Sequence, residues 1–130
     1  MFEKLVAEEF PNAIPEKFRD KVSNVAFLIE REPSQILRAQ EGLAQSETLL
    51  GHYRGIPRTS RGDYYGVGST LPDTITLFQI PIEQEAQVFG GGEDAVRRVI
   101  RETIWHEVAH HFGMNEGQVR EREALRKIIK

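Results

Sequence analysis

Two histidines and a glutamate near the carboxy-terminal end of the chain form a pattern that could do chemistry. His106, Glu107 and His110 make up the motif H-E-x-x-H, in a stretch whose apolar residues recur with helical spacing. A helix turns about 100° per residue, so His106 and His110 share one face, one turn apart, where both imidazoles can bind one Zn²⁺. Glu107 lies beside them and is predicted to be the general base that takes a proton from metal-activated water. The pattern therefore predicts a hydrolytic metal centre.

The third metal ligand is predicted to come from the residues that follow the motif. Gly113 stands three residues after His110 and can end the helix in a left-handed turn, which would bring Glu116 back towards the metal. The full pattern is then H-E-x-x-H-x-x-G-x-x-E. Glu116 could instead be an acidic residue in the first turn of a last helix. In that case Glu121, or less readily Glu123, is the alternative carboxylate ligand.

The alternative to a metal centre is a surface helix that carries His and Glu by coincidence. The neighbouring residues argue against it, because apolar side chains surround most of this helix. They are Ala95, Val96, Val99, Ile100, Ile104, Trp105, Val108, Ala109 and Phe112. Such a helix is expected to be buried, and buried histidines need polar partners. A metal ion is a suitable partner. Without one, Glu107 would be a salt-bridged or supporting carboxylate.

Beyond these residues, the sequence resembles the small zincin-like metallopeptidases, a family long known only as a domain of unknown function. The resemblance covers most of the chain and is carried by five stretches: NVA (24–26), LGHYRGIP (50–57), TSRG (59–62), LPDTITLF (71–78) and HEVAHHFG (106–113). In that family an acidic residue, usually Asp, stands three residues after the glycine. Glu116 occupies this position and is one methylene longer. The resemblance implies a zinc-dependent peptidase with a minimal zincin fold.

Composition restricts the classes of protein to consider. The chain has 130 residues, 39% of them hydrophobic and 28% charged, with a net charge of −3 and no cysteine. It is expected to form one domain over residues 1–130. The net charge argues against nucleic-acid binding, and a disulfide or thiolate zinc site is excluded. No apolar stretch is long enough to cross a membrane, and the acidic amino terminus is unlike a signal peptide, so a cytoplasmic location is expected.

The elements that must position the motif follow from hydrophobic periodicity and from the placement of proline and glycine. Residues 25–30 form a continuous apolar run, which predicts a central strand buried on both faces. Residues 73–80 alternate in the manner of a strand, and Pro81 after them favours a place near the sheet edge. Helices are predicted at 1–10 (ended by Pro11), 16–22, 94–112 and 116–129. Less definite elements are a helix capped by Ser34, a strand within 49–55 and a short helix within 82–88.

Several polar residues outside the motif could support catalysis. The glycine-rich segment 55–73 contains Arg58, Arg61, Tyr64 and Tyr65, any of which could stabilise the oxyanion of a tetrahedral intermediate. Each could equally be an ordinary packing residue of a loop. His111 projects about 100° away from His110 and is expected to contact a nearby carbonyl or carboxylate, or to be partly exposed. His52 is expected to be structural.

Together these features predict an α+β fold: a minimal zincin-like domain with a small mixed sheet of three to four strands packed on a long metal-binding helix with flanking helices. The predicted reaction is peptide-bond hydrolysis, with a peptide or protein substrate added along residues 74–80. The site should be shallow, because no second subdomain could form a far wall. The alternative function is a metal-stabilised binding or scaffold protein with little or no peptidase activity. The sequence leaves the oligomeric state open.

Overall fold

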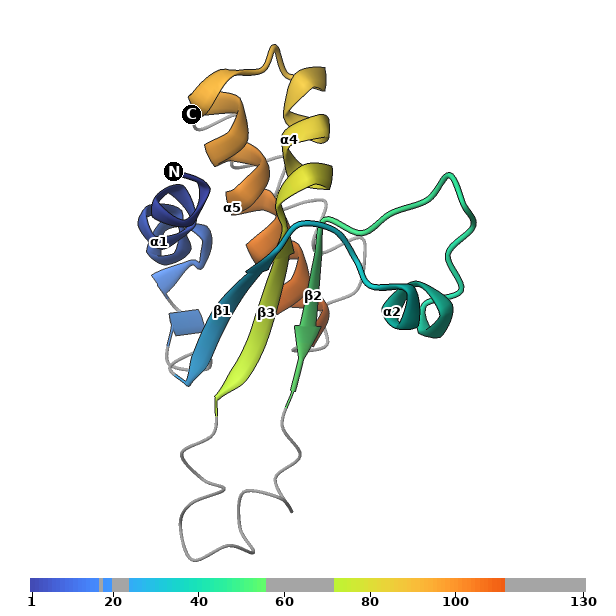
Figure 1. The fold of residues 1–130 in the computed structure, drawn as a ribbon. Coiled ribbons are helices and arrows are strands. Elements are labelled where there is room, and N and C mark those ends of the chain that lie inside the picture. The colour runs from blue at the N-terminus through green and yellow to red at the C-terminus, as the bar shows by residue number, and fades with distance from the viewer. Residues whose placement is uncertain (17, 20–23, 56–71, 112–130) are drawn as a thin grey trace, which may run out of the picture.

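The structure is a computed structural model that describes residues 1–16, 18–19, 24–55 and 72–111 of the chain. It is an α+β fold, as predicted from the sequence (Figure 1). The elements in chain order are α1 (Phe2–Ala13), β1 (Val25–Glu30), α2 (Gln35–Gln40), β2 (Gly51–Arg54), β3 (Asp73–Phe78), α4 (Gln79–Val88) and α5 (Gly92–His111). No helix in the described part of the chain is long and apolar enough to span a membrane. The predicted helix 116–129 lies outside the described residues.

The described strands form one mixed sheet in the order β1-β3-β2. Strand β1 is parallel to β3, and β2 is antiparallel to β3. Strand β3 therefore occupies the centre, and both of its edges are paired. The prediction that a peptide adds along residues 74–80 is wrong for this reason. Pro81, which suggested an edge position, instead lies in the first turn of α4, where a missing N–H breaks no helical hydrogen bond.

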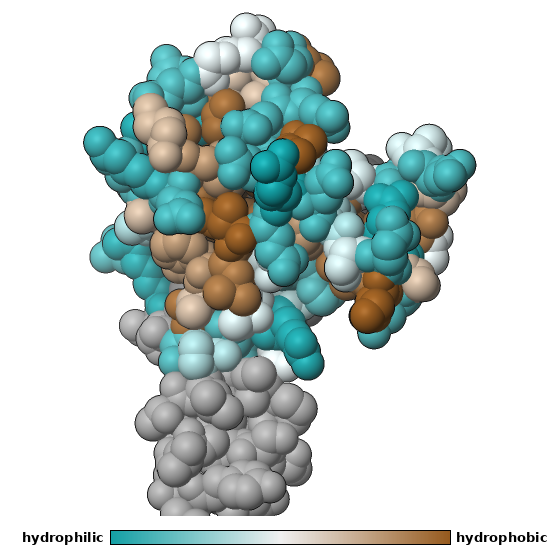
Figure 2. Space-filling view, viewed as in Figure 1, coloured by the Kyte–Doolittle hydropathy of each residue, from teal (hydrophilic) through white to brown (hydrophobic). Residues whose placement is uncertain are grey.

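Strand β1 has the predicted bounds but not the predicted position. It lies at an edge of the sheet, and Leu28 in its middle is 51% exposed. Its neighbours Phe27 and Ile29 pack against the core, since successive side chains point to opposite faces. The face of the sheet turned away from α5 is uncovered by helices among the described residues, and apolar side chains gather on it between polar ones (Figures 1 and 2). A continuous apolar run is therefore compatible both with a central strand that is buried on both faces and with an edge strand that has one exposed face.

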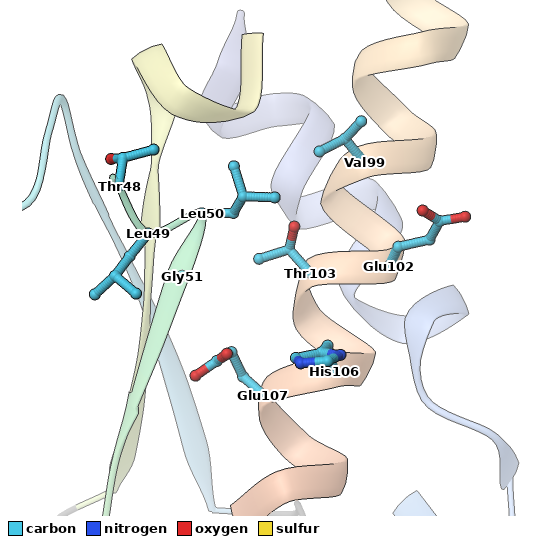
Figure 3. Close-up of a pocket in the computed structure, with 9 residues that line it drawn as sticks. All are labelled: Thr48, Leu49, Leu50, Gly51, Val99, Glu102, Thr103, His106 and Glu107. Carbon is cyan, nitrogen blue, oxygen red and sulfur yellow. The ribbon is translucent and has the colours of Figure 1, made fainter. Parts of the chain in front are cut away.

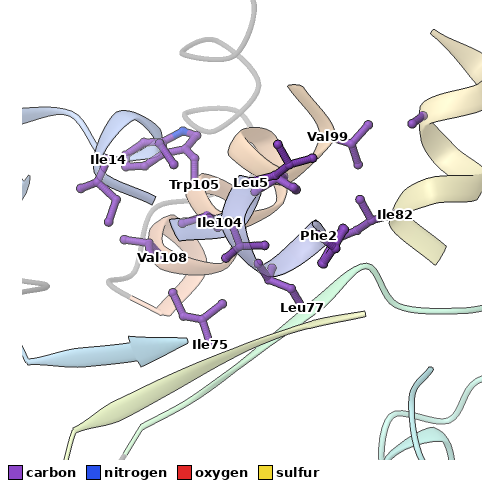
Figure 4. Packing of buried hydrophobic residues seen from close by; sticks show 14 of the residues in the cluster. Phe2, Leu5, Ile14, Ile75, Leu77, Ile82, Val99, Ile104, Trp105 and Val108 are labelled. Carbon is purple, nitrogen blue, oxygen red and sulfur yellow. The ribbon is translucent and has the colours of Figure 1, made fainter. Parts of the chain in front are cut away.

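Helix α5 is the centre of the hydrophobic core. It packs on β2 and β3 with one side and contacts α1 and α4 with others. Its fully buried residues include Ile100, Ile104 and Trp105, which agrees with the predicted burial of Trp105. Phe112 lies outside the described residues. The other large side chains of this core are Phe2, Leu5, Ile14, Ile75, Leu77, Ile82, Val99 and Val108 (Figure 4). The sheet and the two helices α1 and α4 thus hold α5 in a fixed place.

Two predicted boundaries near the amino terminus differ from the structure. Helix α1 continues through Pro11 to Ala13 instead of ending at the proline. A proline near the end of a helix removes only one hydrogen bond, and burial of Ala13 and Ile14 just beyond it offsets that loss. Of the predicted helix 16–22, residues 16, 18 and 19 form a single 3₁₀ turn. The rest of that segment lies outside the described residues.

A buried carboxylate joins α1 to α5. Glu9 is only 6% exposed, and its two oxygens accept hydrogen bonds from Arg97 Nη1 at 2.9 Å and Arg101 Nη1 at 2.8 Å. Burial by itself would raise the pKa of Glu9, but the hydrogen bonds and charges of Arg101 and Arg97 more than offset it and lower the pKa. Both oxygens are therefore paired with cations, which is the condition under which a buried charge is stable.

Replacing Glu9 tests this contact. Glu9→Gln removes the charge that faces two arginines, so we expect the free energy of unfolding at pH 7 to fall by about 2 kcal/mol. Glu8→Gln is the matched control, because Glu8 also pairs with Arg97 but is more exposed, and we expect a loss below about 1 kcal/mol. Denaturant unfolding measures both. Equal losses in the two variants would contradict the structural role of Glu9.

The stabilisation that Glu9 provides has a defined pH dependence. The pKa of Glu9 is lower in the folded protein than its ordinary value of 4.5, so its stabilisation is fully present above 4.5. The stabilisation is lost as the pH falls through the lowered folded pKa. The difference in free energy of unfolding between wild type and Glu9→Gln should therefore shrink in strong acid. Unfolding curves collected from pH 7 downward would show it.

Candidate metal centre

The two motif histidines lie side by side on α5. The ring centroids of His106 and His110 are 4.2 Å apart and their planes are inclined by 59°. This agrees with the i, i+4 spacing, which places both on one helix face. Their surroundings differ from the prediction, because His106 is only half-buried and His110 is exposed. The apolar residues of α5 cover the side towards the sheet and α1, which leaves the histidines on the remaining side.

Glu107 points to the edge of β2 that pairs with no other strand among the described residues. Its Oε1 accepts a hydrogen bond of 3.1 Å from the backbone N–H of Tyr53. Burial is the main influence on this carboxyl and raises its pKa, while the Tyr53 N–H and the charges of His106, His110 and His52 lower it by less. A carboxylate in such surroundings binds a proton more readily than an exposed one does. The predicted general base is thus held at a strand edge, one residue from the first histidine.

The position of Glu107 depends on how closely β2 approaches α5. A Cβ built on Gly51 would lie 2.8 Å from Thr103 Cγ2, and a Cβ on Gly55 would lie 2.7 Å from His111 Cε1. A larger residue at Gly51 or Gly55 would therefore force Thr103 or His111 to move. The Tyr53–Glu107 contact lies midway between them. Four helical residues rise about 6 Å and two strand residues about 6.6 Å, so the two elements keep the same register through all three contacts.

A groove opens between the start of β2 and α5, directly beside His106 and Glu107 (Figure 3). Its volume is about 330 Å³. The lining residues are Thr48, Leu49, Leu50 and Gly51 on one side and Val99, Glu102, Thr103, His106 and Glu107 on the other. Figure 3 shows the carboxylate of Glu107 directed towards β2 at one end of the groove, with Leu50 and Val99 at the other. The groove therefore joins an apolar wall to the polar motif.

His111 and Tyr53 form a second cluster at the carboxy-terminal end of α5. Their rings stack with centroids 3.9 Å apart and planes inclined by 17°. The Tyr53 hydroxyl donates a hydrogen bond of 2.8 Å to Asp73 Oδ2, and His111 Nε2 lies 3.8 Å from the same oxygen. His111 thus faces a carboxylate and is partly exposed, in agreement with the prediction. His52 projects to the other side of β2, where Nε2 lies 3.3 Å from Glu41 Oε1.

The described residues contain part of the predicted site. His106, Glu107 and His110 come together as expected, but within residues 1–16, 18–19, 24–55 and 72–111 no group of three metal-binding side chains occurs. The predicted third ligand Glu116 and its alternatives Glu121 and Glu123 lie outside the described residues, as does Gly113. The same holds for Arg58, Arg61, Tyr64 and Tyr65.

Sequence reasoning did not single out Tyr53, Asp73 or Thr103. Tyr53 and Asp73 stand in two of the stretches that carry the family resemblance. Their place in these stretches was the signal that could have identified them from the sequence. Thr103 precedes Glu107 by four residues and therefore lies one turn back on the same face of α5. Its Oγ1 is buried and has no hydrogen-bond partner among the described residues. The approach of β2 to this face could not be derived from spacing along the helix.

Comparison with known proteins identifies the family of the chain. None of the curated proteins with which the sequence was compared matches it. The family model described as "zincin-like metallopeptidase" matches residues 22–125, which is most of the chain. The match includes β2, β3 and all of α5, which carries the two motif histidines. The chain therefore belongs to the family of zincin-like metallopeptidases.

Proposed function

We propose that this protein is a zinc-dependent peptidase whose metal is held by His106, His110 and Glu116 and whose general base is Glu107. One observation carries the proposal: the carboxylate of Glu107 is fixed at a free strand edge, beside two adjacent imidazoles and at the mouth of a groove. A peptidase of this kind needs these parts in one place. Family membership supports a metal-dependent hydrolase.

The donor set suits zinc. Two neutral imidazoles on one helix face and a carboxylate are ligands that Zn²⁺ accepts in catalytic sites, with room for a further ligand. The half-buried setting of His106 and the exposed setting of His110 leave both imidazoles accessible to a metal. Zn²⁺ bound there would lower the pKa of water towards neutrality and polarise an amide carbonyl. Glu121 is the alternative source of the carboxylate.

Glu107 is the residue that would move the proton. Its Oε1 is held by the Tyr53 N–H, so we assign the proton transfer to Oε2. This oxygen would accept a proton from the attacking water and then give it to the nitrogen of the leaving amine. The hydrogen bond to the strand keeps the carboxylate from rotating away. The geometry thus supports one carboxylate acting first as base and then as acid.

Strands β1 and β2 each have an edge that is unpaired among the described residues, and the edge of β2 is the one beside Glu107. The carbonyl of Leu50 accepts a hydrogen bond from Phe78 N–H, so Leu50 faces the central strand. In an antiparallel pair the next residue, Gly51, directs its backbone groups the opposite way, and so does Tyr53. A peptide can add to this edge through main-chain hydrogen bonds and pass beside Glu107. An apolar side chain of the peptide would then fit the groove between Leu50 and Val99.

The metal site is tested by its ligands. We expect near-stoichiometric zinc in the untagged wild-type protein, a loss of zinc in His110→Ala, and a loss in Glu116→Ala but not in Glu121→Ala. The reason is that removal of one of three protein ligands greatly weakens a zinc site. Elemental analysis of the four proteins provides the measurement. A wild type that neither contains zinc nor takes it up would refute the proposal.

The role of Glu107 is tested separately from metal binding. We expect Glu107→Gln to retain zinc and to lower kcat by about 10² to 10⁴-fold, the usual contribution of a general base. Glu85→Gln, the same chemical change at an exposed position of α4, should leave kcat unaltered. Cleavage of a peptide library, followed by kinetics on a cleaved member, gives these rates. A zinc-loaded wild type that cleaves no peptide would favour the scaffold function instead.

A further inference from the structure

We infer that Tyr53 and Asp73 are positioning residues that hold Glu107 and the last turn of α5 in place. This inference rests on the proposed function, because it concerns the same site. The contacts that tie them to the site are with Glu107, with His111 and with each other, so both would act through neighbours. Tyr53 acts through its backbone on Glu107 and through its ring on His111. Asp73 acts through Tyr53 and His111.

Tyr53 is the residue at which three parts of the site meet. Its backbone N–H is bonded to Glu107, its ring stacks on His111, and its hydroxyl is bonded to Asp73 on the central strand. The last of these fixes the side chain to β3, which is paired on both edges. Movement of Tyr53 would therefore disturb the general base and the residue next to His110 at the same time.

The space around His111 is shaped for this contact. Gly55 leaves room for the imidazole, since a Cβ there would lie 2.7 Å from Cε1. The alternation of strand residues places Tyr53 and Gly55 on one face of β2, and Asp73 lies on the same face of β3. One ring face of His111 thus contacts Tyr53, and its Nε2 points towards Asp73 Oδ2. These contacts fix the ring in one orientation.

The cluster holds the two residues of α5 that follow its last core contacts. Val108 and Ala109 are buried in the core, whereas His110 and His111 after them are exposed. Helix ends fray unless side chains hold them, and His110 belongs to this end. The Tyr53–Asp73–His111 contacts hold the turn that carries the second proposed ligand. Their role is therefore expected to appear in metal affinity and in turnover.

The test compares Tyr53→Phe and Asp73→Asn with the wild type. Tyr53→Phe keeps the ring and the backbone but loses the bond to Asp73. We expect the Kd for Zn²⁺, measured by competition with a chromophoric chelator, to rise roughly tenfold, because supporting groups of metal ligands typically contribute tenfold to a hundredfold. On a cleaved peptide kcat should fall roughly tenfold, with KM changed by less than about twofold. Asp94→Asn, an exposed carboxylate in the first turn of α5, is the control that should change neither.

A double variant separates positioning through one bond from two unrelated effects. If Tyr53 and Asp73 act through their shared hydrogen bond, Tyr53→Phe with Asp73→Asn should resemble the more severe single variant in Kd and kcat. Independent structural effects would multiply instead. Multiplicative losses, or wild-type values of Kd and kcat in both single variants, would overturn the inference.

The inference can fail separately from the proposed function. If wild type binds zinc but cleaves no peptide, the peptidase proposal fails and the Kd comparison still decides the inference. If wild type binds no zinc, the inference is tested by the rate of amide hydrogen exchange at residues 108–111 of the metal-free protein. We expect exchange there to be about tenfold faster in Tyr53→Phe than in wild type or Asp94→Asn. Equal exchange rates in all three proteins would overturn the inference.

Discussion

The close approach of strand β2 to helix α5 is the constraint on which the candidate site depends. Gly51 against Thr103, Tyr53 against Glu107 and Gly55 against His111 are three contacts in one register. Two residues of strand and four residues of helix advance by nearly equal distances, so the match persists over two helical turns. A side chain at Gly51 would meet Thr103 and the backbone oxygen of Thr76, so β2 or α5 would have to shift there. The hydrogen bond that fixes Glu107 would then lengthen.

The rest of the fold maintains this approach. Strand β3 lies between β1 and β2 and carries Ile75 and Leu77 into the core under α5, so the sheet cannot slide along the helix without losing buried area. On another side, Glu9 binds Arg97 and Arg101 and joins α1 to α5. Apolar packing holds the helix against the sheet. The ion pairs fix the position of α1 relative to α5, because a hydrogen-bonded charge pair tolerates little displacement.

The sequence predicted local features well where one property decided them. The apolar spacing of residues 95–109 gave the buried side of α5, and Ser34 does cap α2, with its Oγ accepting from Leu37 N–H. Predictions failed where the place of a segment in the fold depends on which other element packs beside it. The apolar run 25–30 forms an edge strand because β3 pairs beside it on one side only. Pro81 was interpreted as a sign of an edge but lies in a helix. Neither outcome follows from local composition.

The sequence by itself determined that two imidazoles meet on one face of a helix: the ring centroids of His106 and His110 are 4.2 Å apart, because helical geometry is local and the spacing is fixed. It also determined the family and the α+β class. Only the tertiary structure decided where Glu107 points, which strand offers a free edge, and that Tyr53 and Asp73 support the end of α5. These contacts join residues more than fifty positions apart in the case of Tyr53 and Glu107. Such contacts depend on how the sheet and the helix pack, and no spacing along the chain encodes that.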